Sequence, residues 1–219
     1  PGPITPVEPS KETPAVTVEQ GPPLFPDPLP LQIETVPEGL ANLSAQGCNA
    51  CHFEVHEQWE ASAHARGASS ERFEAAMDRV GDSTACRSCH LPLRSQHSQL
   101  AQGYHQGDAT RPELASNESW DPTLMTEGVT CVTCHVREGK VLSSRAVLSA
   151  PHPMAQSAEL ASSAMCASCH QLSWEGADQP IYDTFGEWSR SAYADAGIRC
   201  QDCHMPPVAG LATASRFAA

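Results

Sequence analysis

The sequence predicts a mainly α-helical fold with much irregular structure and little or no β-sheet. Helix-forming patterns occupy residues 49–65, 70–80, 156–171 and 184–196. No segment shows the sustained alternation of apolar and polar residues that is typical of a half-buried strand. Five cysteine motifs start only 34 to 45 residues apart, so the chain between them has room for short helices and loops alone.

The expected helix over 184–196 has the clearest ends. Thr184 is a suitable N-cap, because its hydroxyl can accept a hydrogen bond from a free amide of the first turn. Gly197 is a suitable C-terminal stop, because glycine adopts the left-handed conformation that ends many helices. Pro206 and Pro207 would end any helix that runs through the last cysteine motif.

Proline content divides the chain into regions. Residues 1–40 hold eleven of the nineteen prolines, which excludes a continuous helix or a central strand. This region is expected to be an extended, polyproline-like N-terminal arm that lies on its own domain or on a neighbouring subunit. Residues 41–208 hold all the cysteine motifs and form the expected folded domain, and residues 209–219 form an expected loose tail.

All ten cysteines fall in C-x-x-C pairs, and a histidine follows each pair directly. C-x-x-C-H is the attachment signature of c-type haem: the thiols add to the haem vinyl groups and the histidine becomes the proximal iron ligand. The cysteines are Cys48, Cys51, Cys86, Cys89, Cys131, Cys134, Cys166, Cys169, Cys200 and Cys203. The proximal histidines are His52, His90, His135, His170 and His204.

Other interpretations of the cysteines fit less well. A disulfide framework needs no histidine after each pair, and zinc ribbons do not repeat a trailing histidine in every motif. A thioredoxin-like redox site has one such motif rather than five. The sequence therefore predicts five haem c groups, each with its iron, in a compact pentahaem domain whose folding depends on the cofactor.

Five further histidines lie outside the motifs, one for each predicted haem iron. They are His56, His64, His97, His105 and His152. The match predicts bis-histidine ligation, which closes the iron and suits it to electron transfer.

Alternatives remain for several of these ligands. His97 and His105 lie in a polar stretch, where solvated surface histidines are ordinary. His56 follows the first proximal histidine by four residues and would have to serve a neighbouring haem. Methionine is the other candidate axial ligand, and the available methionines are Met77, Met125, Met154 and Met165.

Aromatic and basic side chains are expected to surround the porphyrins. Tryptophans would pack on porphyrin edges, and arginines would pair with haem propionates; ordinary core packing and solvated surface charge are the alternatives. The tryptophans are Trp59, Trp120, Trp174 and Trp188. The arginines are Arg66, Arg87, Arg94 and Arg137.

The formal net charge is −13. Such an acidic chain is not expected to bind nucleic acid or anionic membranes, but it suits basic redox partner proteins. Haem c is attached after export, so the mature chain is expected in the periplasm or outside the cell. The longest apolar runs are too short for a transmembrane segment.

Segments around the motifs add a family resemblance. They are Trp59-x-x-Ser62-x-His64-Ala65, Glu127-Gly128-Val129-Thr130, Pro151-His152 and Thr184-Phe185-Gly186-Glu187-Trp188. Over roughly residues 45–207 the combination resembles the multihaem cytochrome c family related to the tetrahaem electron acceptor of hydroxylamine oxidoreductase. The resemblance implies a mostly helical fold with stacked and perpendicular haem pairs, and it implies that His64 and His152 are distal ligands.

The C-terminus departs from that family pattern. Such chains often carry a histidine in a short segment after the last motif, whereas this chain reads Ala214-Ser215-Arg216-Phe217. One iron is then ligated by His56, ligated by a neighbouring chain, or open.

The favoured function is electron transfer by a periplasmic or extracellular carrier that is not an enzyme. It would act as a free shuttle, as a subunit of a larger redox complex, or in a haem filament assembled through the N-terminal arm. The alternative is a reductase or oxidase of small nitrogen or sulfur compounds with one open haem. No motif ends in lysine, as the active motif of related nitrite reductases does, and nothing marks Tyr104, Tyr182 or Tyr193 for a haem cross-link. A purely structural use of haem is the third interpretation.

Overall fold

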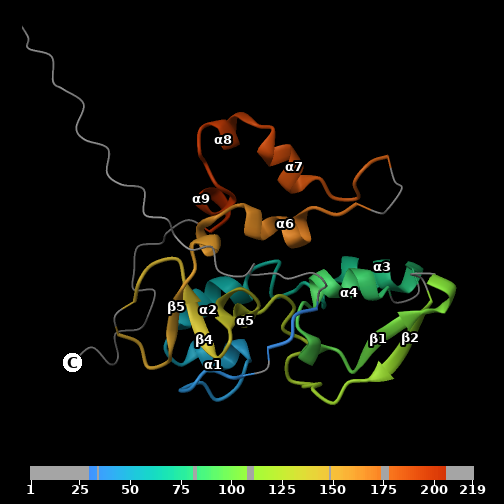
Figure 1. Cartoon of the computed structure of the whole chain (residues 1–219), viewed down its shortest axis with the longest axis horizontal. Coiled ribbons are helices and arrows are strands. Elements are labelled where there is room, and N and C mark those ends of the chain that lie inside the picture. Colours follow the sequence, from blue (N-terminus) through green and yellow to red (C-terminus); the bar gives the residue numbers. More distant parts are fainter. Residues whose placement is uncertain are drawn as a thin grey trace, which may run out of the picture.

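Short helices joined by long loops, with two small sheets, make up the fold (Figure 1). The computed structural model describes residues 30–33, 35–80, 83–107, 111–147, 149–173 and 178–205. Helices account for 40% and strands for 15% of the confidently placed residues. The prediction of a mainly α fold with little or no β-sheet is therefore wrong, because two sheets are present.

The elements follow one another in a fixed order along the chain. The α-helices are α1 Ala45–Asn49, α2 Phe53–Glu60, α3 Glu71–Val80, α4 Thr84–His90, α5 Cys131–His135, α6 Ala164–His170, α7 Thr184–Ser189, α8 Ala192–Asp195 and α9 Cys200–His204. The 3₁₀ helices are η1 Arg94–Gln96, η2 His105–Gly107 and η3 Ala158–Ala161. The strands are β1 Gln99–Tyr104, β2 Pro112–Ser116, β3 Val136–Arg137, β4 Lys140–Ser143 and β5 Met154–Gln156.

Both sheets lie in stretches where the sequence shows no strand pattern. Strands β1 and β2 form an antiparallel hairpin whose register shifts between Ala101 and Gly103. In the second sheet, β4 pairs antiparallel with β3 and parallel with β5. Glu138 and Gly139 connect β3 to β4 with positive φ angles of 50° and 70°, as a tight two-residue hairpin turn requires.

The predicted helices are confirmed to different extents. The helix expected over 70–80 is present as α3, with Phe73 and Met77 on its buried face. The helix expected over 49–65 is shorter, because α2 covers only Phe53–Glu60. The helix expected over 156–171 is helical only in η3 and α6, since β5 extends to Gln156.

The helix expected over 184–196 is split into α7 and α8. Asp183 occupies the N-cap position, and Thr184 is the first helical residue. Gly197 has a φ of +71° and follows the end of α8, so its predicted role as a helix stop is confirmed.

A small apolar core lies beneath the motif helices α1 and α5. Its members are Leu31, Leu43, Leu93, Leu124, Val132 and Val136. Leu31 comes from the end of the predicted N-terminal arm, and its amide donates to the carbonyl of Pro92 at 2.6 Å. Residues 1–29 and 34 of the predicted arm (residues 1–40) lie outside the described residues, as does the predicted C-terminal tail (residues 209–219).

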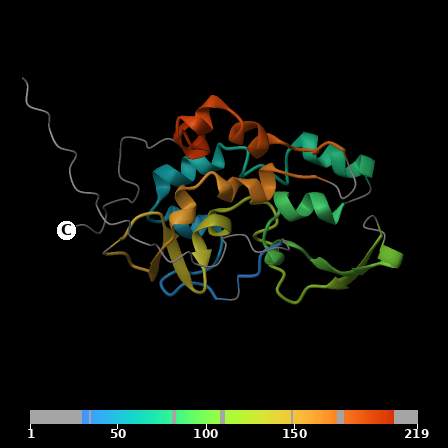
Figure 2. The same cartoon turned by 45° about the horizontal axis from the view of Figure 1, so that its top comes forward.

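Helices α6 to α9, with η3, form a C-terminal lobe (residues 158–205) that covers one side of the body (Figures 1 and 2). Of the lobe residues that the structure describes, only Ser163 is buried. Large apolar side chains such as Tyr182, Tyr193 and Met205 are exposed. The lobe therefore has no apolar core of its own in its described part. No helix in the described ranges is long and apolar enough to cross a bilayer.

Candidate functional site

All five C-x-x-C-H motifs lie on short helical turns. Helices α4, α5, α6 and α9 each end at the histidine of their motif. The first motif begins in α1, and the amide of His52 still donates to the carbonyl of Cys48 at 2.9 Å. One helical turn brings residues i, i+3 and i+4 to one face. Each motif therefore presents two thiols and an imidazole together.

Two proximal histidines are held by backbone carbonyls. Nδ1 of His90 lies 2.6 Å from the carbonyl oxygen of Gly67, and Nδ1 of His135 lies 2.9 Å from that of Leu142. An Nδ1–H group that donates to a carbonyl fixes the tautomer and leaves Nε2 free to bind a metal. The ring of His90 is also stacked on Phe73, with ring centres 4.2 Å apart.

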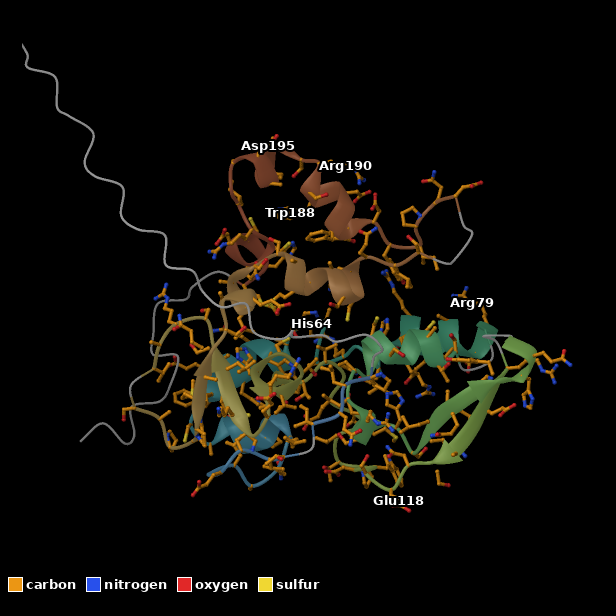
Figure 3. All side chains as sticks on the ribbon, viewed as in Figure 1. His64, Arg79, Glu118, Trp188, Arg190 and Asp195 are labelled. Carbon is orange, nitrogen blue, oxygen red and sulfur yellow. The ribbon has the colours of Figure 1, made fainter. Side chains whose placement is uncertain are left out.

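His64 and His170 face each other from segments far apart in the sequence. Their ring centres are 6.1 Å apart, with an interplanar angle of 61°. Imidazole nitrogens bind first-row metal ions at about 2 Å, so two imidazoles that bind one ion from opposite sides have ring centres about 6 Å apart. Burial, and then the neighbouring His170, lower the pKa of His64, which favours the neutral form that ligates metals. Figure 3 shows His64 directly beneath α6, which ends at His170.

His152 lies near enough to His52 for the two imidazoles to interact electrostatically. Burial, and then the charge of His52, lower the pKa of His152. Its Nδ1 is buried without a hydrogen-bond partner among the described residues. A buried imidazole nitrogen with no partner is unusual unless it serves a ligand. The spacing of His64 and His170 thus fits an iron held between two imidazoles, and the unpartnered nitrogen of His152 leaves that imidazole available as a ligand.

The other three predicted distal histidines have different neighbours. His56 is buried, with its Nε2 3.3 Å from the side-chain nitrogen Nε2 of Gln46. Nε2 of His97 lies 2.6 Å from the carbonyl oxygen of Leu91. His105 is exposed beside the β1–β2 hairpin and pairs with Glu113. Among the five, His64 has a ring contact with the motif histidine His170, and His152 lies within electrostatic range of the motif histidine His52.

The backbone of His64 is fixed by the segment before the third motif. The amide of Val129 donates to the carbonyl of His64 at 2.9 Å, and Nε1 of Trp59 donates to the carbonyl of Val129 at 2.8 Å. Gly128 has a φ of +59°, and a Cβ placed there would lie 2.4 Å from the carbonyl oxygen of His64. Only glycine fits this contact. Two segments singled out by the family resemblance therefore pack on each other.

A second glycine packs against the segment of His152. Gly39 has a φ of +86°, and a Cβ there would lie 2.4 Å from the carbonyl oxygen of Pro151. A glycine with positive φ thus packs closely on the backbone of His64, and another packs on the backbone of Pro151, the residue before His152.

Contacts between cysteines place the motifs next to one another. The thiols of Cys48 and Cys131 share a hydrogen bond, which lowers the pKa of Cys48 and raises that of Cys131. A hydrogen bond between the thiols of Cys89 and Cys169 likewise lowers the pKa of Cys89 to about 7. The first motif therefore adjoins the third, and the second adjoins the fourth.

The fourth motif also adjoins the third and the fifth. Burial first, and then the nearby Cys200 and Cys134, raise the pKa of Cys166 to about 11. Oγ of Ser163, at the N-cap of α6, accepts a hydrogen bond from the amide of Cys200 at 3.0 Å. The motifs are therefore connected in the order first, third, fourth and second, with the fifth attached to the fourth. All ten thiols are free of disulfide bonds.

The predicted aromatic and basic residues are placed in varied surroundings. Nε1 of Trp188 donates to the carbonyl of Ile198 at 2.9 Å, Trp120 is exposed, and Trp174 lies outside the described residues. The guanidinium of Arg137 donates to three carbonyls of the third motif segment, those of Val132, Thr133 and Val136. Burial lowers its pKa.

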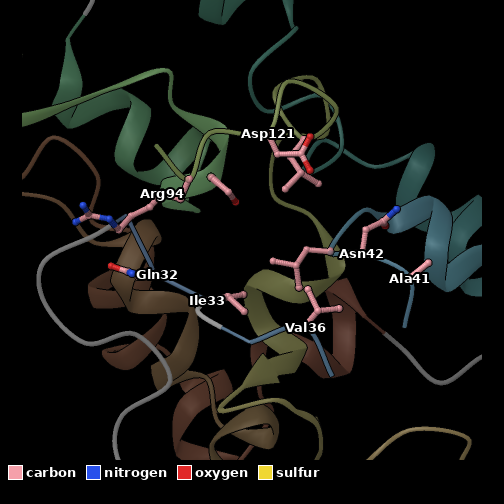
Figure 4. A pocket seen from close by; sticks show the side chains of 11 residues that line it. Gln32, Ile33, Val36, Ala41, Asn42, Arg94 and Asp121 are labelled. Carbon is pink, nitrogen blue, oxygen red and sulfur yellow. The ribbon is translucent and has the colours of Figure 1, made fainter. Parts of the chain in front are cut away.

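A cavity of about 520 Å³ borders the apolar core, since the core residues Leu43 and Leu124 are part of its lining (Figure 4). Its lining includes Ile33, Val36, Arg94 and Asp121, and no motif cysteine or histidine lines it. It is therefore separate from the motif side chains. In the described ranges, no three His, Cys, Asp or Glu side chains gather as a single-ion metal site.

Comparisons of the chain with protein-family models, with curated proteins and with solved structures give no match. Its function is therefore argued from its own residues.

Proposed function

We propose that this chain binds five haem c groups through its C-x-x-C-H motifs and carries electrons through them. The observation that carries the proposal is the spacing of His64 and His170. A proximal histidine at the end of a motif helix faces a remote second histidine at 6.1 Å. This distance suits two axial ligands of one iron. Bis-histidine iron exchanges electrons without opening a coordination position to substrate.

The C-terminal lobe supports the proposal because it needs a cofactor to stabilise its fold. Its described residues bury one serine and no apolar side chain, although a folded unit normally needs an apolar core. The cysteines of α6 contact cysteines of α4 and α9. A porphyrin attached at each motif would supply the missing apolar contacts between these helices.

The neighbouring attachment points support electron transfer in particular. Each motif thiol is the point at which one haem is held, and every motif adjoins at least one other. Electrons entering at any haem would have an adjacent haem to move to. The fourth motif, with three neighbours, would be the branch point of this path.

We place the protein in the periplasm or outside the cell, because haem c is attached there, and we propose basic redox proteins as its partners, because the chain is acidic. On this proposal it is a carrier rather than an enzyme and a member of the multihaem cytochromes that its motifs resemble. Shuttle, complex subunit and filament remain alternatives that depend on the arm.

Expression with a cytochrome c maturation system is expected to give a protein whose mass exceeds that of the chain by five haems. Its haems should be reduced and reoxidised completely by redox mediators, with no turnover of nitrite, hydroxylamine or sulfite. A mass increase of fewer haems would contradict the cofactor assignment. Turnover together with carbon monoxide binding by the native ferrous protein would favour the reductase or oxidase interpretation.

Removal of the fourth haem is expected to open the C-terminal lobe. The double variant Cys166→Ala/Cys169→Ala should be cut by protease within residues 158–205 at least ~10-fold faster than the parent, because local opening is then easier by about 1.4 kcal/mol. The body should stay resistant. Ser168→Ala, which changes an exposed residue of the same motif, is the matched control and should leave the rate unchanged. Equal rates for both variants would show that haem does not hold the lobe.

A further inference from the structure

Glu127 is a buried carboxylate that joins two motif helices. Its side chain is 9% exposed. It accepts hydrogen bonds from the hydroxyl of Ser44, from the amide of Ala45 at 3.0 Å and from the hydroxyl of Thr130 at 2.8 Å. Ser44 is the N-cap of α1 and Thr130 is the N-cap of α5. One carboxylate thus binds the starts of the helices that carry the first and third motifs.

The negative charge of Glu127 is not neutralised by a cation in the described part of the chain. All three donors are uncharged, and the ion pairs found there do not include Glu127. A carboxylate that accepts three hydrogen bonds has its oxygens satisfied in the ionised form. A buried charge acts on its neighbours through a medium of low dielectric constant, so its field is stronger than at the surface.

The haem attachment points nearest to Glu127 belong to both helices. Cys48 lies in α1 and Cys131 is the first residue of α5. Their thiols interact through a hydrogen bond, without a disulfide. The charge of Glu127 raises the pKa of both thiols, after the larger effects of that hydrogen bond and of burial. The carboxylate therefore lies beside the junction of the first and third haems.

We propose that the charge of Glu127 lowers the reduction potentials of the first and third haems together. This inference rests on the proposed function. Reduction adds one electron to a ferric iron and makes it ferrous, which removes one positive charge from the haem. A fixed negative charge nearby stabilises the ferric form and so disfavours reduction. The two haems next to Glu127 would then form a low-potential pair within the chain of five.

The sign of the effect separates this role from a structural one. Glu127→Gln removes the charge but keeps the shape: the amide oxygen can accept from Ala45 and Thr130, and the amide nitrogen can donate to Ser44. Thr130→Val removes one donor and keeps the charge, which leaves the carboxylate less neutralised. The potentials should rise in the first variant and fall in the second. Simple loosening of the network would move both variants in the same direction.

The test is a potentiometric titration of the haem-loaded, full-length protein followed by its visible spectrum. In Glu127→Gln we expect two-fifths of the absorbance change to shift to higher potential, with the rest unmoved. In Thr130→Val we expect the same fraction to shift to lower potential. Glu118→Gln removes a charge from an exposed residue and should leave the titration unchanged.

Several outcomes would overturn the inference. They are an unshifted Glu127→Gln titration, an equal shift in Glu118→Gln, or a rise in Thr130→Val. If Glu127→Gln yields no folded protein, Thr130→Val decides alone, and anything but a fall overturns the inference. Failure of the proposed function is a separate result, because a chain without five haems would be seen by mass before any titration.

Discussion

Replacing His64 by alanine is expected to convert one of the five haems from low spin to high spin. The side chain faces His170 at 6.1 Å, so its loss would leave the iron of the fourth motif with one protein ligand. The ferrous variant should then bind carbon monoxide at about one-fifth of its haem, beyond any binding by the parent. Magnetic circular dichroism or visible spectroscopy measures the spin change.

The matched control for this substitution is His105→Ala. His105 was also predicted as a distal ligand from the sequence, but its side chain is 53% exposed and pairs with Glu113. Its removal should leave the spin state unchanged. A high-spin haem in His105→Ala, or none in His64→Ala, would contradict the placement of these two histidines.

Combining His64→Ala with His152→Ala sharpens the test. His64 faces His170, and His152 lies within electrostatic range of His52, so we expect the two substitutions to open different irons. The high-spin signal of the double variant should equal the sum of the single variants. A double variant no different from either single one would mean that both histidines serve the same iron.

The motifs were predictable because their chemistry is local. Residues i, i+3 and i+4 share a helical face whatever the rest of the fold does, and all five motifs do lie on helical turns. The pairing of distal histidines was not predictable from the residues alone. His64 meets His170 because the tertiary fold places α6 over the segment of His64. No local pattern in the intervening sequence indicates this placement.

The strands escaped prediction for a physical reason. Strand β1 has Leu100 as its single buried residue, and β2 has none, so an exposed hairpin of this kind shows no clear apolar alternation. Strands β4 and β5 pair in parallel across the loop that connects them. Such a pairing leaves no local pattern of apolar residues in the sequence. One signal was present: Glu138-Gly139 between Arg137 and Lys140 is a two-residue turn that suits a hairpin.

The segment that contacts the backbone of His64 was visible in the sequence in part. Glu127-Gly128-Val129-Thr130 was noted as a segment before the third motif, but its contact with the backbone of His64 needed the fold. Gly128 is needed for steric reasons rather than for chain flexibility, because its neighbours leave no room for a Cβ.

Gly128→Ala is expected to displace His64 and to destabilise the protein strongly. A Cβ at this position would lie 2.4 Å from the carbonyl oxygen of His64 and 2.8 Å from that of Ala65. The left-handed φ of +59° adds strain of about 1–3 kcal/mol for a residue other than glycine. Forcing the backbone of His64 aside should cost a further ~1–3 kcal/mol and raise the high-spin fraction at the same haem that His64→Ala opens.

Gly197→Ala is the control that isolates the close contact. Gly197 has a similar φ of +71°, but a Cβ there would meet nothing within 4 Å. It should therefore show only the left-handed strain, with all haem spin states unchanged. Denaturant unfolding and visible spectra of both variants measure the difference. Equal destabilisation without a spin change in Gly128→Ala would mean that the segment before the third motif does not position His64, whereas a spin change confined to Gly128→Ala would tie the anchor to the iron that His170 and His64 share.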